Sequence, residues 1–260
     1  MSEIIQNRSP KKVGQKEIEK AMKYLVAFDF DMTVIDDDSD HYILKILAPE
    51  LLDQVRQASK EGRQWTDLCD WSVGELHKRG FQPSQMNCAL RGVPFNAKMK
   101  NVFECLHQKG HDILIISDAN TIYIDEISHE KGIKGFITNV ITNPAKYNQD
   151  GRLEIKRHTT SQDAHSCSRC PPNLCKGREL GKYIDSKLPL KYDRILYFGD
   201  GGNDFCPSSK LSESDVCFPR KGYKFHQMLQ DENFKGLIKA SVVEWDHADD
   251  ILLELDKILP

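Results

Sequence analysis

The sequence contains no apolar run that approaches the roughly 18–20 residues needed to span a bilayer. Residues 1–20 are polar and lack the apolar stretch of a secretory signal, so we expect a cytoplasmic protein. The formal net charge is only −3, which gives no global electrostatic reason to expect a nucleic acid or an anionic membrane as a partner. Eight cysteines in 260 residues do not suggest a disulfide framework, so mostly reduced thiols are expected.

What the chain does have is an alternation of short apolar runs and helical segments, which predicts an α/β fold. The expected strands are residues 24–28, 111–116, 135–142, 194–198 and 240–245. The expected helices are residues 97–109, 120–131, 178–187, 203–210 and 247–258. A hairpin is expected over 145–157, with Asp150-Gly151 at its turn. This alternation favours a Rossmann-like three-layer core with a mostly parallel sheet.

Residues 38–96 have a different texture. Apolar residues recur there at helical spacing, and strand-like runs are absent. We therefore expect a helical cap at 38–96, inserted into a core made of residues 23–37 and 97–260. Residues 1–22 are expected to form a flexible N-terminal arm.

Three of the expected strands end in polar residues. Asp29 and Asp31 follow the first strand, Ser117-Asp118 follows the second, and the segment 199–204 reads GDGGND. Residues two apart in an extended segment face the same way, so both carboxylates of the first pair can enter one site. Close carboxylates repel each other unless a cation lies between them or one keeps its proton. Ligands of parallel sheets bind at these strand ends, so the pattern predicts a cation and phosphate site.

Each of these motifs has an ordinary structural explanation when it is taken alone. An acidic pair can solvate a loop, a Ser-Asp pair can cap a helix, and a glycine-rich segment can simply turn the chain. The occurrence of all three at successive strand ends, in this order, favours a single functional site.

These motifs resemble those of a known superfamily. DFDMT, ISDAN, CKG and GDGGND look like the four motifs of the haloacid dehalogenase (HAD) phosphatases. FDFDMTVIDDDSD, NPAKYNQDGRL, CSRCPPNLCKG and PRKGY extend the resemblance, over about residues 24–255, to the branch of phosphoethanolamine/phosphocholine and pyridoxal-phosphate phosphatases. SVVEW at 241–245 is most similar to the pyridoxal-phosphate type. Plant phosphatases of the branch are also similar, so branch membership does not fix the substrate.

The resemblance implies roles for individual residues. Asp29 is the expected nucleophile, which forms an acyl-phosphate, and Asp31 is the expected general acid and base. Thr33 is expected to support the loop. Ser117 and Lys176 are expected to contact the phosphoryl oxygens, although Lys176 taken alone would be an ordinary surface lysine.

The resemblance also implies Mg2+. Its expected ligands are the Asp29 side chain, the Asp31 main-chain carbonyl and Asp200, while Asp204 lies behind them or bonds to a metal water. Asp40 and Asp118 match substrate-contacting positions, where they would suit a cationic group. Their alternative roles are a solvated loop acid for Asp40 and a helix N-cap for Asp118.

The insert lies where this superfamily places a cap. Trp65, Trp71 and Phe81 would line its inner face or, as we expect for at least two of them, belong to the core. A second open point is the cysteine-rich segment His165-x-Cys167-x2-Cys170-x4-Cys175, which permits a zinc site. A loop of free thiols is the expectation there, and a Cys167–Cys170 disulfide is not expected.

The function that follows is hydrolysis of a small phosphorylated metabolite, either pyridoxal 5′-phosphate or phosphoethanolamine/phosphocholine. One alternative is a phosphoserine or phosphoprotein phosphatase, although a helical cap disfavours large protein substrates. Another is a non-enzymatic module that only accepts phosphate, but Asp31 favours turnover. Protein partners and oligomeric state do not follow from the sequence.

Overall fold

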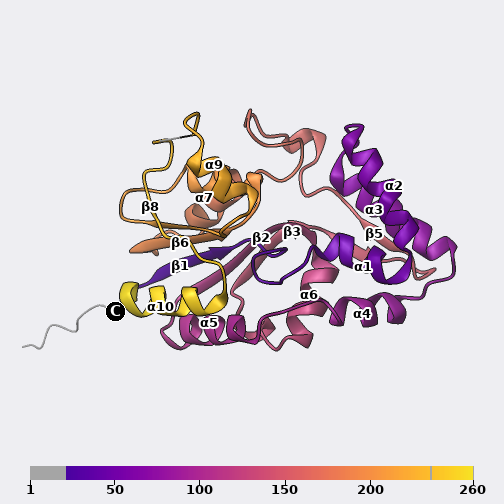
Figure 1. Ribbon diagram of the computed structural model, residues 1–260, viewed down its shortest axis with the longest axis horizontal. Coiled ribbons are helices and arrows are strands. Elements are labelled where there is room, and N and C mark those ends of the chain that lie inside the picture. The colour runs from indigo at the N-terminus through magenta and orange to yellow at the C-terminus, as the bar shows by residue number, and fades with distance from the viewer. Residues whose placement is uncertain (1–21, 235, 260) are drawn as a thin grey trace, which may run out of the picture.

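The computed structural model describes residues 22–234 and 236–259 (Figure 1). The predicted N-terminal arm lies outside the described residues, except for Met22. A six-stranded parallel sheet with strand order β3-β2-β1-β6-β7-β8 forms the centre of the core. Its strands are β1 (Tyr24–Phe28), β2 (Asp112–Asn120), β3 (Asn139–Asn143), β6 (Arg194–Gly199), β7 (Val216–Pro219) and β8 (Ser241–Val242).

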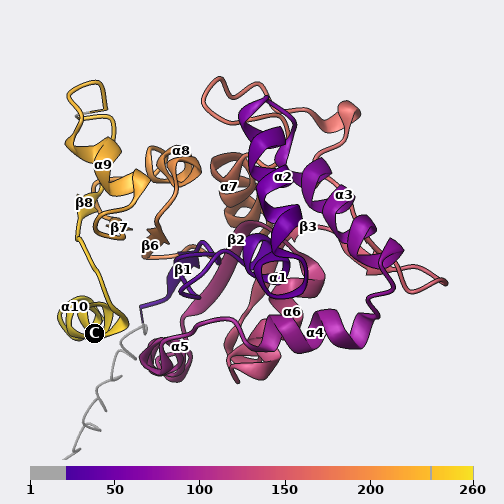
Figure 2. The same ribbon diagram turned by 45° about the vertical axis from the view of Figure 1, so that its right-hand side comes forward.

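Helices cover both faces of this sheet, as the alternation in β1 requires. Val26 and Phe28 point to one face, and Leu25 and Ala27 to the other, because successive side chains in a strand alternate. The first face is covered by α5 (Ala97–Gln108), α6 (Thr121–Glu130) and α10 (Ala248–Ile258). The second face is covered by α7 (Lys176–Ser186), α8 (Phe205–Ser208) and α9 (Lys224–Gln230) (Figures 1 and 2). The predicted three-layer α/β core is confirmed.

The segment between β1 and α5 is helical throughout its regular structure. It contains α1 (Ser39–Leu47), α2 (Pro49–Lys60), α3 (Trp65–Lys78) and α4 (Pro83–Arg91). Proline occupies the first position of α2 and of α4, where its missing N–H costs no hydrogen bond. Figure 1 shows these helices at one end of the sheet, past the strand ends that carry the acidic motifs.

The predicted hairpin is confirmed, and it packs on the helical segment. Strands β4 (Ala145–Tyr147) and β5 (Leu153–Ile155) pair antiparallel, and Gly151 in the turn has a φ of +81°. Arg152 binds the carboxylate of Asp70 on α3, with a closest distance of 2.8 Å. The hairpin therefore ties α3 to the core.

Several predicted elements differ from the structure. Residues 135–142 begin with a 3-10 turn, η1 (Lys134–Phe136), before β3. The helix expected at 203–210 is a 3-10 turn, η3 (Gly202–Asp204), followed by α8. The strand expected at 240–245 shortens to β8. The sequence analysis missed β7, because VCFP is too short to show a period, and it also missed α9.

A further 3-10 turn, η2 (Ser161–Asp163), lies in the segment before α7. Among the described residues, no helix is both long and apolar enough to cross a membrane.

Candidate active site

The acidic motifs lie at the point where the order of the sheet reverses. Strand β1 is flanked by β2 on one side and by β6 on the other, so the carboxyl ends of these three strands are adjacent. Asp29 follows β1, Ser117 lies near the end of β2, and Asp200 follows β6. Such a reversal leaves a crevice at the strand ends in which ligands bind.

Asp29 directly follows β1 and is held by contacts of its backbone and of its carboxylate. Its backbone N–H donates to the carbonyl of Phe198 (2.9 Å), which continues the pairing of β1 with β6. Its Oδ1 accepts from the N–H of Phe30 (2.7 Å), and its Oδ2 lies 2.7 Å from Nζ of Lys176. The carboxylate is thus fixed in one orientation by two contacts.

Lys176 is the first residue of α7 and is buried, with 1% of its surface exposed. Its Nζ bridges Asp29 and Asp204, which lies 2.8 Å away. Burial alone would lower the pKa of Lys176, but Asp204 and then Asp29 outweigh burial and raise this pKa above its ordinary value. The two carboxylates therefore favour the charged form of the lysine, and its burial shows that the surface-lysine alternative is wrong.

Asp204 is fully buried and accepts four hydrogen bonds. Oδ1 accepts from Lys176 and from the hydroxyl of Tyr197 (2.8 Å each), while Oδ2 accepts from the N–H groups of Asp200 (3.1 Å) and Gly201 (2.9 Å). A Cβ on Gly199 would lie 2.4 Å from the Asp204 carboxyl carbon, so only glycine permits this approach. Asp204 is thus committed to fixing the loop and the lysine.

Asp200 is more open. Its Oδ1 accepts from the hydroxyl of Thr33 (3.0 Å), so Thr33 links the Asp31 loop to Asp200. Burial, followed by the charge of Asp204, raises the pKa of Asp200 to about 7. Burial also raises the pKa of Asp29, although Lys176 opposes the shift.

Carboxylate oxygens of Asp29, Asp200 and Asp204 all lie within 4.8 Å of one another. Three carboxylates face one ammonium group, so the cluster has an excess of negative charge that a divalent cation would neutralise. Hard oxygen ligands of this kind fit Mg2+.

Asp31 lies in the loop between β1 and α1. Its Oδ1 accepts from the N–H of Ser39 (3.0 Å) at the start of α1. Burial, followed by the charges of Asp38 and Asp40, raises the pKa of Asp31 well above its ordinary value. A raised pKa favours the protonated form of the carboxyl group, which is the form that a general acid requires.

The loop that carries Asp31 is fixed by a residue that the sequence analysis did not single out. Met32 has a left-handed backbone (φ 55°), which is unfavourable for a side chain other than glycine. Arg220 holds this turn, because its guanidinium donates to the Met32 carbonyl (2.5 Å) and to Asp36 (2.7 Å). Arg220 belongs to PRKGY, so its motif was visible but its role was not.

The end of β2 provides a hydroxyl and a further carboxylate. Ser117 is buried, and its Oγ accepts from the N–H of Ala119 (3.2 Å). Oδ2 of Asp118 accepts from the amide of Asn203 (2.7 Å). Asp118 does not act as a helix N-cap, because Asn120 caps α6. That alternative for Asp118 is therefore wrong.

Asp40 comes from the helical segment and is buried, so a solvated loop acid is also wrong. Its Oδ2 accepts from the indole N–H of Trp65 (3.0 Å) and from the thiol of Cys69 (3.1 Å), both on α3. Burial, followed by the charge of Asp38, raises the pKa of Asp40 to about 7.

These groups surround one cavity of about 370 Å³. It is lined by Asp29, Asp31, Met32, Asp38, Asp40, His41, Trp65, Ser117, Asp118, Asp200, Gly201 and Asn203. The structure thus brings the predicted residues together, with Lys176 and Asp204 behind the cavity wall. The sequence analysis did not identify Asp38, His41 or Asn203 as residues of the site. Trp71 and Phe81 pack against the core, while Trp65 both packs there and lines the cavity.

Comparison with known proteins agrees with this geometry. The sequence matches the family described as "Putative Phosphatase" over residues 24–259. It is 36% identical to pyridoxal phosphate phosphatase PHOSPHO2 of Mus musculus, over 92% of this chain and 99% of that protein. It is 29% identical to the phosphoethanolamine/phosphocholine phosphatase of Homo sapiens, over 95% of this chain and 93% of that protein. A solved substrate-bound phosphoserine phosphatase complex shares the fold, with a TM-score of 0.58, 16% identity, and coverage of 93% of this chain and 100% of that one.

The fold, the acidic strand ends and these relatives define a phosphoric monoester hydrolase of the HAD superfamily. This excludes a non-enzymatic module. Within that class, the chain belongs to the Putative Phosphatase family, in the branch of the PHOSPHO2 and phosphoethanolamine/phosphocholine phosphatases.

Proposed function

We propose that the chain hydrolyses a small phosphomonoester with a positively charged group, with Mg2+ bound and through an aspartyl-phosphate on Asp29. The proposed substrates are pyridoxal 5′-phosphate, or phosphoethanolamine and phosphocholine. The observation that carries the proposal is a single cavity that is lined both by Asp29 and by further carboxylates. Asp29 lies at the wall backed by Lys176, and Asp40 and Asp118 lie among the residues that line the remainder.

In the first step, a carboxylate oxygen of Asp29 attacks phosphorus and the bond from phosphorus to the leaving oxygen breaks. Asp31 gives its proton to that leaving oxygen. In the second step, the Asp31 carboxylate takes a proton from water, whose oxygen attacks phosphorus and releases Asp29 and inorganic phosphate. The raised pKa of Asp31 supports its role as the proton donor of the first step.

Lys176 and Ser117 provide the positioning that phosphoryl transfer requires. Lys176 neutralises charge on a phosphoryl oxygen, and its contact with Asp29 opposes the rise in the pKa of this nucleophile that burial causes. Mg2+ when bound stabilises the charge on the phosphoryl oxygens. We propose that the side chains of Asp29 and Asp200 and the Asp31 main-chain carbonyl hold it, with Asp204 supporting the loop.

The acidic lining favours a cationic substrate. Phosphoethanolamine and phosphoserine form a matched pair, because phosphoserine is the same molecule with one added carboxylate. Asp40 and Asp118 would attract the ammonium group of both but repel that carboxylate. The acidic lining therefore disfavours phosphoserine as the substrate, and with it the alternative function of a phosphoserine phosphatase. Helices of the segment 38–96, which we propose as the cap, restrict access for a phosphoprotein.

The test measures kcat/KM with Mg2+ for phosphoethanolamine, phosphocholine, pyridoxal 5′-phosphate, phosphoserine and pyrophosphate. We expect kcat/KM for phosphoethanolamine to exceed that for phosphoserine by about tenfold or more, since a repulsion of about 1.4 kcal/mol between carboxylates corresponds to a factor of ten. This ratio should fall in Asp40→Asn and stay constant in the exposed control Asp53→Asn. If kcat/KM is highest for phosphoserine or for pyrophosphate, the substrate proposal is overturned.

We also propose a cytoplasmic location. None of the eight cysteines forms a disulfide, which suits a reducing compartment.

A further inference from the structure

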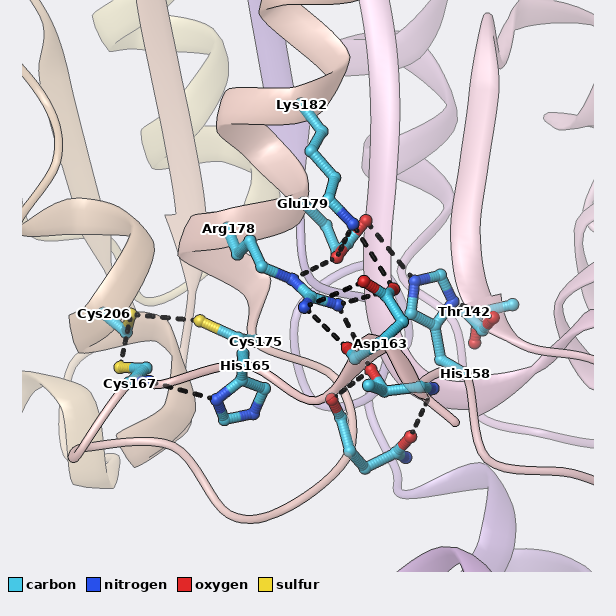
Figure 3. Close-up of polar contacts among 12 residues, drawn as sticks. Thr142, His158, Asp163, His165, Cys167, Cys175, Arg178, Glu179, Lys182 and Cys206 are labelled. Atoms are coloured by element: carbon cyan, nitrogen blue, oxygen red, sulfur yellow. Dashed lines mark hydrogen bonds and ion pairs between the residues drawn. The ribbon is translucent and has the colours of Figure 1, made fainter. Parts of the chain in front are cut away.

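Four cysteines meet at one point beside the active site. The Sγ atoms of Cys167, Cys170, Cys175 and Cys206 all lie within 4.8 Å of one another. Sγ of Cys206 lies 3.7 Å from that of Cys167 and 3.7 Å from that of Cys175 (Figure 3). The first three come from the segment before α7, whereas Cys206 is in α8, so tertiary folding assembles the group.

The spacing of the sulfurs matches a tetrahedral metal site. Zinc bound by thiolates at about 2.3 Å in a tetrahedron requires about 3.8 Å between sulfurs. A disulfide requires about 2.05 Å. The observed 3.7 Å from Cys206 to Cys167 and to Cys175 agrees with the first value and is too long for the second. Soft thiolate ligands also select zinc over the Mg2+ that carboxylates prefer.

The structure corrects the fourth ligand that the sequence suggested. The ring of His165 is engaged elsewhere: Nδ1 accepts from the N–H of Cys167 (3.3 Å), and Nε2 lies 3.1 Å from the carbonyl of Pro171. His165 therefore orients the cysteine loop, and Cys206 takes the fourth place (Figure 3). Cys206 lies some thirty residues further along the chain, so spacing could not reveal it.

The loop that carries Cys167 and Cys170 is held at both ends by contacts that do not involve sulfur. On one side, Arg178 of α7 donates to the carbonyl (2.8 Å) and the carboxylate of Asp163 (Figure 3). On the other, Asn173 is buried, and its amide donates to Asn143 (2.8 Å) and Thr66 (2.9 Å). The loop therefore presents its cysteines at a fixed position.

Cys206 also packs closely on the start of α7. A Cβ at Gly177 would lie 2.8 Å from Sγ of Cys206 and 3.1 Å from its carbonyl oxygen. The glycine of the CKG motif therefore admits the sulfur to this position.

We propose that Cys167, Cys170, Cys175 and Cys206 bind one Zn2+ ion in a tetrahedral structural site. Cys175 directly precedes Lys176, and Cys206 follows Asp204 by two residues. Lys176 and Asp204 form an ion pair of 2.8 Å. The zinc ion joins the two segments that carry this pair and so positions Lys176 against Asp29. Zinc binding is independent of the proposed catalytic steps, and only its effect on turnover rests on them.

The experiment measures metals in the full chain, purified without chelators and dialysed, by mass spectrometry of the elements. We expect about one zinc per chain in the wild type, under about one tenth in Cys170→Ser and Cys206→Ser, and about one in Cys88→Ser, whose cysteine is exposed and outside the cluster. Asp29→Asn should keep its zinc, so failure of the catalytic proposal and of the zinc proposal are distinguishable. Absence of zinc from the wild type, or iron with sulfide in its place, would overturn the proposal.

A second measurement uses only wild-type protein, in case the serine variants do not fold. Alkylation with iodoacetamide, followed by peptide mass spectrometry, should modify Cys88 at once but Cys167 and Cys170 only after a zinc chelator is added. Cobalt substituted for the zinc should give the intense absorption of a tetrahedral thiolate complex. Labelling of Cys167 and Cys170 at the rate of Cys88 without chelator, or a disulfide between them, would refute the site.

Discussion

Asp40 is expected to make the folded state less stable as the pH rises, in protein without added magnesium. Its carboxyl is buried beneath Trp65 and Cys69, and its pKa is raised from 3.8 to about 7. In the unfolded chain the group loses its proton near its ordinary pKa. Between about pH 4 and about pH 7, the folded state therefore holds a proton that the unfolded state has lost, so raising the pH favours unfolding.

The magnitude follows from the size of the rise in pKa. At 1.4 kcal/mol per pKa unit, a rise from 3.8 to about 7 corresponds to about 4 kcal/mol. This stabilisation is present below about pH 4 and is lost once the pH exceeds about 7. Asp40→Asn removes the titration but keeps a carbonyl oxygen that can accept from Trp65 and Cys69. The free energy of unfolding of the variant, relative to the wild type, should therefore rise by up to about 4 kcal/mol across this window.

Urea unfolding at several pH values, without added magnesium, measures this difference. Asp53→Asn is the matched control, because the Asp53 side chain is 83% exposed. The difference between the control and the wild type should not change with pH. If Asp40→Asn gives the same flat profile as Asp53→Asn, the carboxyl of Asp40 is not buried as described, and the reasoning fails.

Three further predictions concern the catalytic core and the packing behind it. Asp29→Asn should lower kcat with p-nitrophenyl phosphate by at least about 1,000-fold and leave the circular dichroism spectrum unchanged; full activity would remove Asp29 as nucleophile. Lys176→Met should cost about 3–5 kcal/mol in urea unfolding, because two buried carboxylates lose their partner, whereas a cost under about 1 kcal/mol would contradict the buried ion pair. Gly177→Ala should destabilise the fold by about 1–3 kcal/mol through its clash with Cys206, while the helical control Gly181→Ala, which has open space, should stabilise it by about 0.5–1 kcal/mol; equal effects would refute the close contact.

Much of the sheet could be predicted because its strands carry strong local patterns. The apolar run Tyr24–Phe28 and the helical period of α5 and α10 appear directly in the sequence. Strand β7 could not be predicted, since four residues buried on both sides show no alternation. The strand predicted at 135–142 was wrong at its start, where the structure has the 3-10 turn η1. Apolar and β-branched residues alone do not determine which segments pair in a sheet.

The candidate site was predictable where its residues fall at strand ends. Asp29, Ser117 and Asp200 come together because parallel strands place their carboxyl ends at one edge. Arg220 and Cys206 could not be assigned in this way. Their partners lie far away in the sequence, so only the folded chain shows what they contact.

The most direct test of the central claim is to trap the phosphorylated aspartate during turnover. Protein mixed with substrate and Mg2+ is quenched within milliseconds and reduced with borohydride, which converts an aspartyl-phosphate to homoserine, and its peptides are then analysed by mass spectrometry. We predict homoserine at position 29 in the wild type and an unreduced chain in Asp29→Asn. Modification at another residue, or rapid release of phosphate with no trapped residue at any quench time, would contradict the account.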